Sequence, residues 1–598
     1  MEIVEHLANP KDVAAAGGER PPESRGSVWA DIKHAGRLIK QYFAADPWVG
    51  SGLLVLKLGL AAAASYAMVS VQTDMASVTT ALAEKNASVV PVLLTSAILV
   101  FGAVLLAGIV GDWTRFTLRI RMRTNLTEGL LGKWLAYDRY YYLDRKGNVG
   151  FPEQRIQEDA SDFVEQVLVL GPALITGFLP VFLYSGKLWS LSQPISLEPI
   201  GLPFVLHGYL VIATVGFAVL WTIVTHLIGS KLTRTEVTRL GLEANFRQEM
   251  SVVRENSEAI AFQRGASFEG SRIMGIFALI KENWKHYTFA NLRVAFATQV
   301  PTMLFIMGPT LLCAPFVLDG RMKVGDIQFV TAAMVTVFGS IGIFIQSYQT
   351  IALLRAGTSR LRYFDESMQE SSVRGDIDLK PAEGNAFAVR GLTLDLPDGR
   401  RLVEVGNLDI APGDRVLVKG RSGAGKSTFL RALAGLWHCG RGRVEIPEAG
   451  NIYFMPQKSY MPDGTLASLM AYPTDPAKVS DERYHLLLER LGLQALKPRL
   501  HEYASWQRML SPGEQQRIAA ARAVINEPDY LFADEATSAL DLHSEANLYS
   551  LLAESLPNAA IVSIAHRPTV EKFHNRIIQF SDGKAMEVDH DLAETPSN

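Results

Sequence analysis

The sequence predicts an α-helical membrane domain with six transmembrane helices, followed by an α/β domain of the phosphate-loop type. Hydrophobic residues make up 48% of the 598 residues, and the mean hydropathy of +0.12 is high for a soluble protein. Six apolar runs precede residue 355, and the pattern G-x-x-x-x-G-K-S-T stands at 420–428. Because a chain of this length needs more than one hydrophobic core, we assign these features to separate domains.

Charge and cysteine content exclude several other classes of protein. The net charge of −3 gives no reason to expect nucleic acid as a partner. The two cysteines, Cys313 and Cys439, fall in different predicted domains, so neither a disulfide framework nor a metal cluster is indicated.

The first segment, 1–45, is predicted to be cytoplasmic. It contains acidic and basic residues and has no charged-then-apolar start with a cleavage site, so we predict no removable signal peptide. Within this segment, residues 32–43 fit either a helix at the membrane surface or a solvated lead-in.

Six apolar runs are each long enough to cross about 30 Å of hydrocarbon as a helix. They occupy 49–71, 89–111, 163–189, 204–229, 294–318 and 329–354. Lysine and arginine gather after the second and fourth runs, whereas the loops on the opposite side are short and carry few basic residues. The positive-inside rule therefore places both termini in the cytoplasm.

The two basic loops, 112–162 and 230–293, have helical, amphipathic patterns and predict helices that continue out of the bilayer. With the six runs they form a predicted membrane domain at 46–365. Within the runs, Lys57 fits either a cavity-facing position or one where its ammonium group reaches the membrane surface. For Glu165, near the end of its run, reaching the surface is the better explanation.

Residues 366–385 are polar, contain glycine and proline, and predict a linker. Beyond it, apolar residues alternate in 392–396 and 402–405 on either side of Asp398-Gly399, which predicts a β-hairpin. The hairpin leads into the phosphate-loop pattern. We therefore predict an α/β nucleotide-binding domain at 386–598.

The phosphate-loop pattern lies between a short apolar run and a helical run, which is the context in which it binds phosphate. Its residues are Gly420, Arg421, Ser422, Gly423, Ala424, Gly425, Lys426, Ser427 and Thr428. Backbone N–H groups of such a loop surround the phosphates, Lys426 reaches the β- and γ-phosphates, and the Ser427 hydroxyl is placed for Mg²⁺. The pattern predicts ATP and Mg²⁺ as ligands.

Two carboxylates, Asp534 and Glu535, follow the buried-strand pattern of 530–533. Asp534 is placed to hold the metal and Glu535 to polarise the attacking water. An ordinary acidic strand end would be the default if the pair stood alone. Upstream, Ser511 and Glu514 have capping-box spacing, which predicts a helix whose positive end suits a phosphate.

These motifs occur in the order found in ATP-binding cassette (ABC) transporters, and the chain resembles one half of such a transporter. The resemblance implies a six-helix membrane domain with an exporter-like ABC fold, joined to an α/β P-loop ATPase domain. The motifs that carry it are the phosphate loop, Gln457, the segment 510–515, Asp534-Glu535, the segment 538–541 and His566.

The resemblance also implies roles for individual residues. Gln457 senses Mg²⁺, His566 contacts the γ-phosphate beside the catalytic Glu535, and Asp541 couples two ATP sites. Ser511 and Gly513 bind the γ-phosphate of the ATP that a second copy holds. Because none of the motifs is degenerate, the family pattern implies a homodimer with two equivalent sites.

The sequence departs from the family pattern in two places. Pro512 and Glu514 replace the commonest signature residues, and we regard both as harmless because they suit a helix start. Leu396 stands where an aromatic residue usually stacks on adenine, and 388–419 contains no Phe, Tyr or Trp. Stacking adds about 0.5–1.5 kcal/mol, so its absence predicts weak discrimination between ATP and GTP.

The membrane half resembles two transporter groups through its loops. The segments 139–143 and 151–159 are similar to BacA/SbmA-like bacterial peptide-uptake proteins and to the peroxisomal ABC subfamily D. The segment 255–262, with Gly265 and Glu269, is similar to the latter group.

These resemblances imply a multi-pass protein of the bacterial inner membrane, in contact with lipid. Its implied activity is ATP-driven uptake of bulky solutes such as antimicrobial peptides, bleomycin-like compounds or cobalamin. Export of lipids, fatty acyl-CoA or drugs is the alternative. A third possibility is an ATP-gated regulator or channel.

Overall fold

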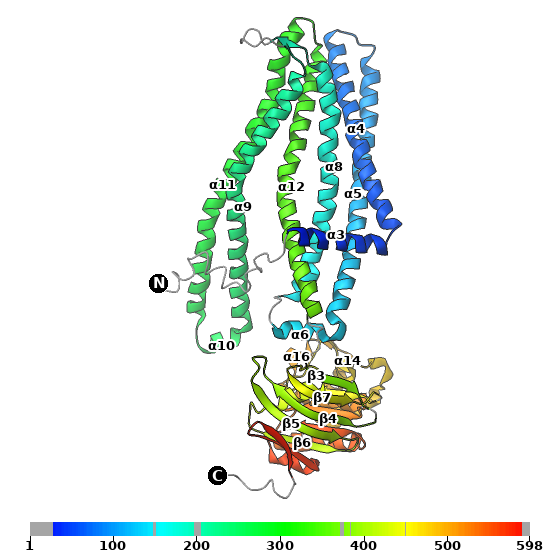
Figure 1. The fold of residues 1–598 in the computed structure, drawn as a ribbon, viewed down its shortest axis with the longest axis vertical. Helices are drawn as coiled ribbons and strands as arrows, with labels where there is room; N and C mark the ends of the chain where they lie inside the picture. Colours follow the sequence, from blue (N-terminus) through cyan, green and yellow to red (C-terminus); the bar gives the residue numbers. More distant parts are fainter. Residues whose placement is uncertain are drawn as a thin grey trace. The chain divides into compact units, whose positions relative to one another are not determined.

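A computed structural model describes residues 28–146, 151–196, 205–370, 376–382, 384–448 and 450–588. The chain divides into two compact units, Met1–Glu370 and Ser371–Asn598, and each is considered by itself. The first unit is helical and the second contains a large sheet (Figure 1).

Long helices form the first unit, and six of them are long and apolar enough, by length and composition, to cross a membrane. They belong to α4 (Val49–Ala83), α5 (Val90–Leu135), α8 (Ala160–Leu191), α9 (Tyr209–Glu255), α11 (Ala266–Leu318) and α12 (Val324–Glu370). The prediction of six membrane-length helices is therefore confirmed for the described residues.

The fourth predicted run begins too early. The helix α9 starts at Tyr209 because Gly208, with a φ of 70°, turns the chain at its N-terminus. Just before that turn, β2 (Val205–Leu206) pairs antiparallel with β1 (Ile195–Ser196). Residue 204 lies outside the described residues.

The predicted helical extensions are confirmed. The helices α5, α8, α9 and α11 all run through parts of 112–162 or 230–293. Short elements join them: η1 (Ala136–Asp138), α6 (Arg139–Lys146), α7 (Pro152–Gln154) and η2 (Arg155–Asp159) between α5 and α8, and α10 (Ser257–Phe262) between α9 and α11.

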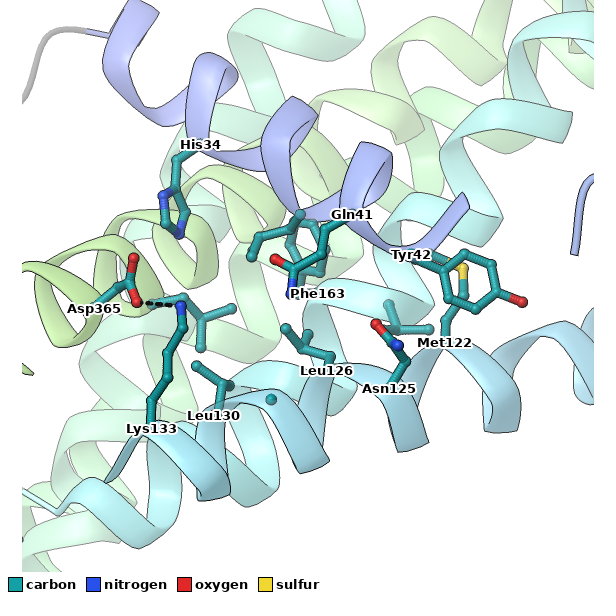
Figure 2. Close-up of a pocket in the computed structure, with 14 residues that line it drawn as sticks. His34, Gln41, Tyr42, Met122, Asn125, Leu126, Leu130, Lys133, Phe163 and Asp365 are labelled. Carbon is teal, nitrogen blue, oxygen red and sulfur yellow. Dashed lines mark hydrogen bonds and ion pairs between the residues drawn. The ribbon is translucent and has the colours of Figure 1, made fainter. Parts of the chain in front are cut away.

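The first described helix, α3 (Val28–Ala45), crosses the long helices and packs on them with one face (Figure 1). Figure 2 shows His34, Gln41 and Tyr42 of this helix beside α5, with Phe163 of α8 and Asp365 of α12 nearby. Because Tyr42 is buried in this contact, a fully solvated lead-in is excluded for this segment. The outward face carries the exposed Trp29 and Ile32.

The C-terminal part of α12 is joined by ion pairs to three other elements. Asp31 of α3, almost fully buried, lies 3.4 Å from Arg355 and 3.2 Å from Arg362. Lys133 of α5 donates to Asp365 at 2.7 Å, as Figure 2 shows.

The third partner of α12 is the π-helical segment η2. Arg360 donates from Nε to both carboxylate oxygens of Asp159, at 3.0 and 2.9 Å. The Asp159 side chain is only 5% exposed. Its buried negative charge is therefore stabilised by the ion pair with Arg360 and by a hydrogen bond from Arg155 at 3.1 Å. These pairs fix α12 against α3, α5 and η2.

Two ionisable residues of the predicted spans also have charged partners. Lys57 lies 3.6 Å from Asp112 of α5, and Glu165 lies 3.1 Å from Arg119. Both contacts join neighbouring helices, and Asp112 and Glu165 lie at the ends of the runs 89–111 and 163–189, where charges are least costly.

The second unit is built on a ten-stranded sheet with the order β3-β7-β4-β5-β14-β13-β6-β12-β11-β8. Its strands are β3 (Ile377–Pro381), β4 (Phe387–Asp395), β5 (Arg401–Ile410), β6 (Arg415–Gly420), β7 (Gly440–Ile446), β8 (Ile452–Met455), β11 (Tyr530–Asp534), β12 (Ala560–Ile564), β13 (Arg576–Ser581) and β14 (Lys584–Val588). β6, β12, β11 and β8 run parallel to one another, which predicts a site at their carboxyl ends.

Helices and short elements surround this sheet. The helices are α13 (Lys426–Leu433), α14 (Leu466–Ala471), α15 (Asp481–Arg490), α16 (Trp506–Met509), α17 (Pro512–Asn526) and α18 (Leu542–Ser555). The shorter elements are η4 (Pro476–Lys478), η5 (Gln494–Arg499), η6 (Pro568–Phe573) and the paired strands β9 (Gly464–Thr465) and β10 (Tyr503–Ala504). Aromatic residues fill much of the core beneath the sheet: Phe387, Phe429, Phe532 and Phe580.

The hairpin prediction is confirmed, because β4 and β5 pair antiparallel around Gly399, whose φ is 84°. The segment predicted as a linker is partly regular structure. α12 continues to Glu370, and β3 pairs with β7 at the sheet edge. The pattern missed β3 because a short edge strand tolerates polar residues and a terminal proline.

We expect Asp159→Asn to destabilise the membrane unit by about 2–3 kcal/mol, since it weakens the charge-assisted hydrogen bonds from Arg360. A lower unfolding temperature in detergent than that of the wild type would show this effect. Glu282→Gln, which removes an exposed pair with Lys285, is the matched control. Equal unfolding temperatures for the two variants would contradict the assignment.

Candidate functional site

The phosphate loop joins the carboxyl end of β6 to the start of α13. Gly420 has a φ of 147°, and a Cβ on it would lie 2.5 Å from the Phe580 carbonyl oxygen. Gly425 precedes α13 with a φ of 98°. Only glycine suits these positions, so the backbone curves into a helix N-terminus that can bind an anion.

Lys426 is almost fully buried inside the loop, at 5% exposure. Its ammonium group donates to the carbonyl oxygens of Gly420 and Arg421, at 2.8 and 3.0 Å. Burial lowers the pKa of Lys426. A buried cation that the described residues pair with carbonyls rather than with a carboxylate fits a polyphosphate ligand.

Ser427 and Asp534 meet at the carboxyl ends of β6 and β11. The Ser427 hydroxyl donates to Oδ1 of Asp534 at 2.9 Å. Burial raises the pKa of this carboxyl group. A hydroxyl and a carboxylate oxygen beside a phosphate loop form a suitable donor set for Mg²⁺, although Mg²⁺ itself remains a prediction.

Glu535 follows Asp534 with a φ of 47°, an uncommon conformation for a residue with a side chain. Two side chains hold its carboxylate. Gln457, just after β8, donates from Nε2 to Oε2 at 3.2 Å, and Nε2 of His566, just after β12, lies 3.2 Å from Oε1. The ends of three parallel strands therefore converge on one carboxylate.

The N-terminus of α17 carries the predicted capping box. The Ser511 hydroxyl accepts from the Glu514 backbone N–H, while the Ser511 N–H donates to Glu514 Oε2 at 2.8 Å. This backbone hydrogen bond is the main cause of the lowered pKa of Glu514. A Cβ on Gly513 would lie 3.2 Å from the Ala539 carbonyl oxygen, so the helix start packs closely on the segment 538–541.

Asp541 is the N-cap of α18. Its carboxylate accepts backbone hydrogen bonds from His543 and Ser544, at 3.0 and 2.9 Å. The bonds from Ser544 contribute most to lowering the pKa of Asp541 to about 2. The role of Asp541 in coupling two ATP sites remains a prediction.

Two residues that the sequence did not single out hold this second group together. Gln516 donates to the Ser538 hydroxyl at 3.1 Å and accepts from the Ala539 N–H at 2.9 Å. Arg567, next to His566, donates to the Leu540 carbonyl oxygen at 2.6 Å. The hydrogen-bond partners of both residues are distant in the sequence. The sequence could have pointed to these two residues only through their positions next to recognised motifs.

The structure thus forms two groups of site residues. Lys426, Ser427 and the residues around Glu535 gather at the phosphate loop. Ser511, Gly513 and Asp541 belong to the second group, and no hydrogen bond among the described residues joins Ser511 or Gly513 to 420–428.

Helices long enough to cross a membrane precede a phosphate-loop domain in which Asp534 and Glu535 form part of the site. This combination defines a membrane protein that hydrolyses nucleotide. The family model for the ABC transporter transmembrane region 2 matches 38–318, and the ABC transporter model matches 403–538. The chain belongs to the ABC transporters. It is a half-transporter that binds ATP and couples its hydrolysis to transport, as the motifs predicted.

Curated relatives cover most of the chain. An uncharacterized ABC transporter ATP-binding protein of Synechocystis is 32% identical over 78% of this chain and 70% of its own length. The inner membrane ABC transporter ATP-binding protein YddA of Escherichia coli is 27% identical, over 80% and 85%. The human lysosomal cobalamin transporter ABCD4 is 26% identical, over 79% and 82%. The chain is therefore similar both to bacterial ABC transporters and to proteins of ABC subfamily D.

We expect Glu535→Gln to reduce ATP turnover at least about 100-fold while nucleotide binding is retained, because the amide cannot accept the proton of the attacking water. Phosphate release by purified protein in lipid, with a fluorescent ATP analogue to follow binding, measures both quantities. Rapid turnover by this variant would contradict the assignment. Ion currents that persist in it would favour the channel alternative.

Aliphatic residues lie beside the phosphate loop, whereas no contact of Leu396 with the loop is found among the described residues. A Cβ on Gly425 would lie 3.2 Å from Leu402 Cδ2, so Leu402 lies directly beside the phosphate loop. We expect GTP hydrolysis at more than about one hundredth of the ATP rate, since no ring-stacking preference of about 0.5–1.5 kcal/mol applies. Parallel measurements of both rates test this, and a GTP rate below that fraction would exclude it.

Proposed function

We propose that this ABC half-transporter forms a homodimer in the bacterial inner membrane and uses ATP and Mg²⁺ to take up bulky hydrophilic solutes, such as cobalamin or antimicrobial peptides. Both termini are cytoplasmic in this proposal. The observation that carries it is the complete set of hydrolytic residues in a single half-transporter chain, whose relatives include a cobalamin transporter.

The homodimer is supported by the lack of any hydrogen bond, among the described residues, between Ser511 or Gly513 and the phosphate loop 420–428. Lys426 and Glu535 belong to one group, and Ser511 belongs to the other. Two copies related by a two-fold axis would complete two equivalent sites. Every motif needed for both sites is present in this one sequence.

In this mechanism, Lys426 and the loop N–H groups bind the phosphates, and Ser427 with Asp534 would hold Mg²⁺. Glu535 accepts the proton of the attacking water, while Gln457 and His566 hold its carboxylate. Closing of the two copies around nucleotide would move the long helices and change which side of the membrane the solute site faces.

Uptake and export make opposite predictions for cells. If the protein imports a toxic peptide, deletion of its gene makes cells resistant to that peptide. If it exports the peptide, deletion makes them more sensitive. Cells complemented with Glu535→Gln should behave like the deletion strain, and complementation with the wild-type gene is the control.

Cargo is tested most directly in membrane vesicles. We expect ATP-dependent accumulation of radiolabelled cyanocobalamin or a labelled peptide at least about tenfold above vesicles that contain Lys426→Ala, because loss of the phosphate-loop ammonium group abolishes turnover. Transport of fatty acyl-CoA or lipid, with neither solute moved, would favour the exporter alternative.

A further inference from the structure

An open groove lies on the membrane unit where α4, α11 and α12 meet. Six of its lining side chains carry hydroxyl or amide groups: Gln72, Thr79, Thr310, Gln328, Thr331 and Thr336. All six belong to helices that are long and apolar enough to cross a membrane. None of the described residues that line this groove is ionisable.

Polar side chains on membrane-length helices are costly where they face lipid. A glutamine in contact with hydrocarbon leaves amide groups without hydrogen-bond partners, and each such group costs a few kcal/mol. Gln72 and Gln328 are only partly buried in the described chain. Because each lies one position outside a predicted apolar run, 49–71 or 329–354, water or a ligand with hydrogen-bonding groups can supply their partners.

The hydrogen bonds within the groove leave defined groups available. The Thr79 hydroxyl donates to the Met75 carbonyl oxygen at 3.1 Å and also contacts one end of the Gln328 amide, which leaves the other end of that amide available. The hydroxyl hydrogens of Thr331 and Thr336 are used on carbonyl oxygens of their own helix, each at 2.8 Å. The groove thus offers an amide donor beside hydroxyl oxygens that can accept.

Charged residues close in sequence to the groove residues line a different pocket. Asp326 lies two positions before Gln328, on another face of α12, and lines that pocket with Lys187 and Lys323. Between the two pockets the helices touch, because the Gly325 N–H donates to the Thr80 hydroxyl at 3.1 Å. The charges are therefore segregated from the groove.

We infer that this groove binds the cargo through its uncharged hydrogen-bonding groups, and that it selects neutral, amide- or hydroxyl-rich solutes over charged amphiphiles. The inference rests on the proposed function, which it deepens by naming the chemistry that is recognised. Donor and acceptor groups on the solute would replace water on Gln328, Thr331 and their neighbours.

The test uses the full-length protein in lipid nanodiscs, with stimulation of ATP hydrolysis by cyanocobalamin as the readout. Gln328→Met with Thr331→Val keeps the side-chain size but removes the amide and the hydroxyl. We expect the half-maximal cyanocobalamin concentration to rise at least about fivefold, because two net hydrogen bonds are lost. Thr95→Val on α5, whose hydroxyl bonds to the Pro91 carbonyl oxygen, is the matched control and should match the wild type.

If the double variant does not fold, Thr331→Val is compared with Thr331→Ser, which retains the hydroxyl. The inference requires that only the serine variant keep wild-type cyanocobalamin affinity. It is overturned if the groove variants respond like the wild type, or if they weaken dimerisation without changing solute affinity. If wild-type protein responds to palmitoyl-CoA and to no neutral solute, the proposed function itself fails.

Discussion

Parallel pairing of β6, β12, β11 and β8 is the constraint on which the ATP site depends. Because the four strands run in the same direction, their carboxyl ends lie at one edge of the sheet. The phosphate loop, Asp534, Gln457 and His566 all follow directly from these ends. A change of register in any one of them would move its side chain out of reach of Glu535.

The membrane unit depends on a different kind of contact. Within the predicted membrane spans its long helices are mostly apolar, so polar contacts add specificity to which helices stay together. α12 receives charged partners from α3, α5 and η2, and buried acids such as Asp31 and Asp159 must keep these partners because an unpaired buried charge is costly. The groove on α12 carries hydroxyl and amide groups instead. The ion pairs that stabilise helix packing are therefore separate from the groups that we propose bind the solute.

Much of this arrangement could be predicted from sequence where the governing contacts are local. The phosphate loop, the β4–β5 hairpin and the Ser511–Glu514 capping box each depend on residues a few positions apart. The ion pair between Asp159 and Arg360 spans 201 positions and has no local pattern. Gln516 was missed for the same reason, since only the folded domain places its partners Ser538 and Ala539, whereas β3 was missed because its edge position tolerates polar residues. Span composition encodes neither the cargo nor the direction of transport, and the groove that we propose binds the cargo is built from three helices that are distant in the sequence.

The contact between α4 and α12 limits which residues can occupy position 325. A Cβ on Gly325 would lie 1.8 Å from the Ala76 carbonyl oxygen, so even the smallest side chain forces the two backbones apart. Backbone atoms cannot yield as the end of a flexible side chain can. In a library of every single replacement, this site should rank among the least tolerant of the membrane unit, although it lies far along the chain from the nucleotide-binding motifs.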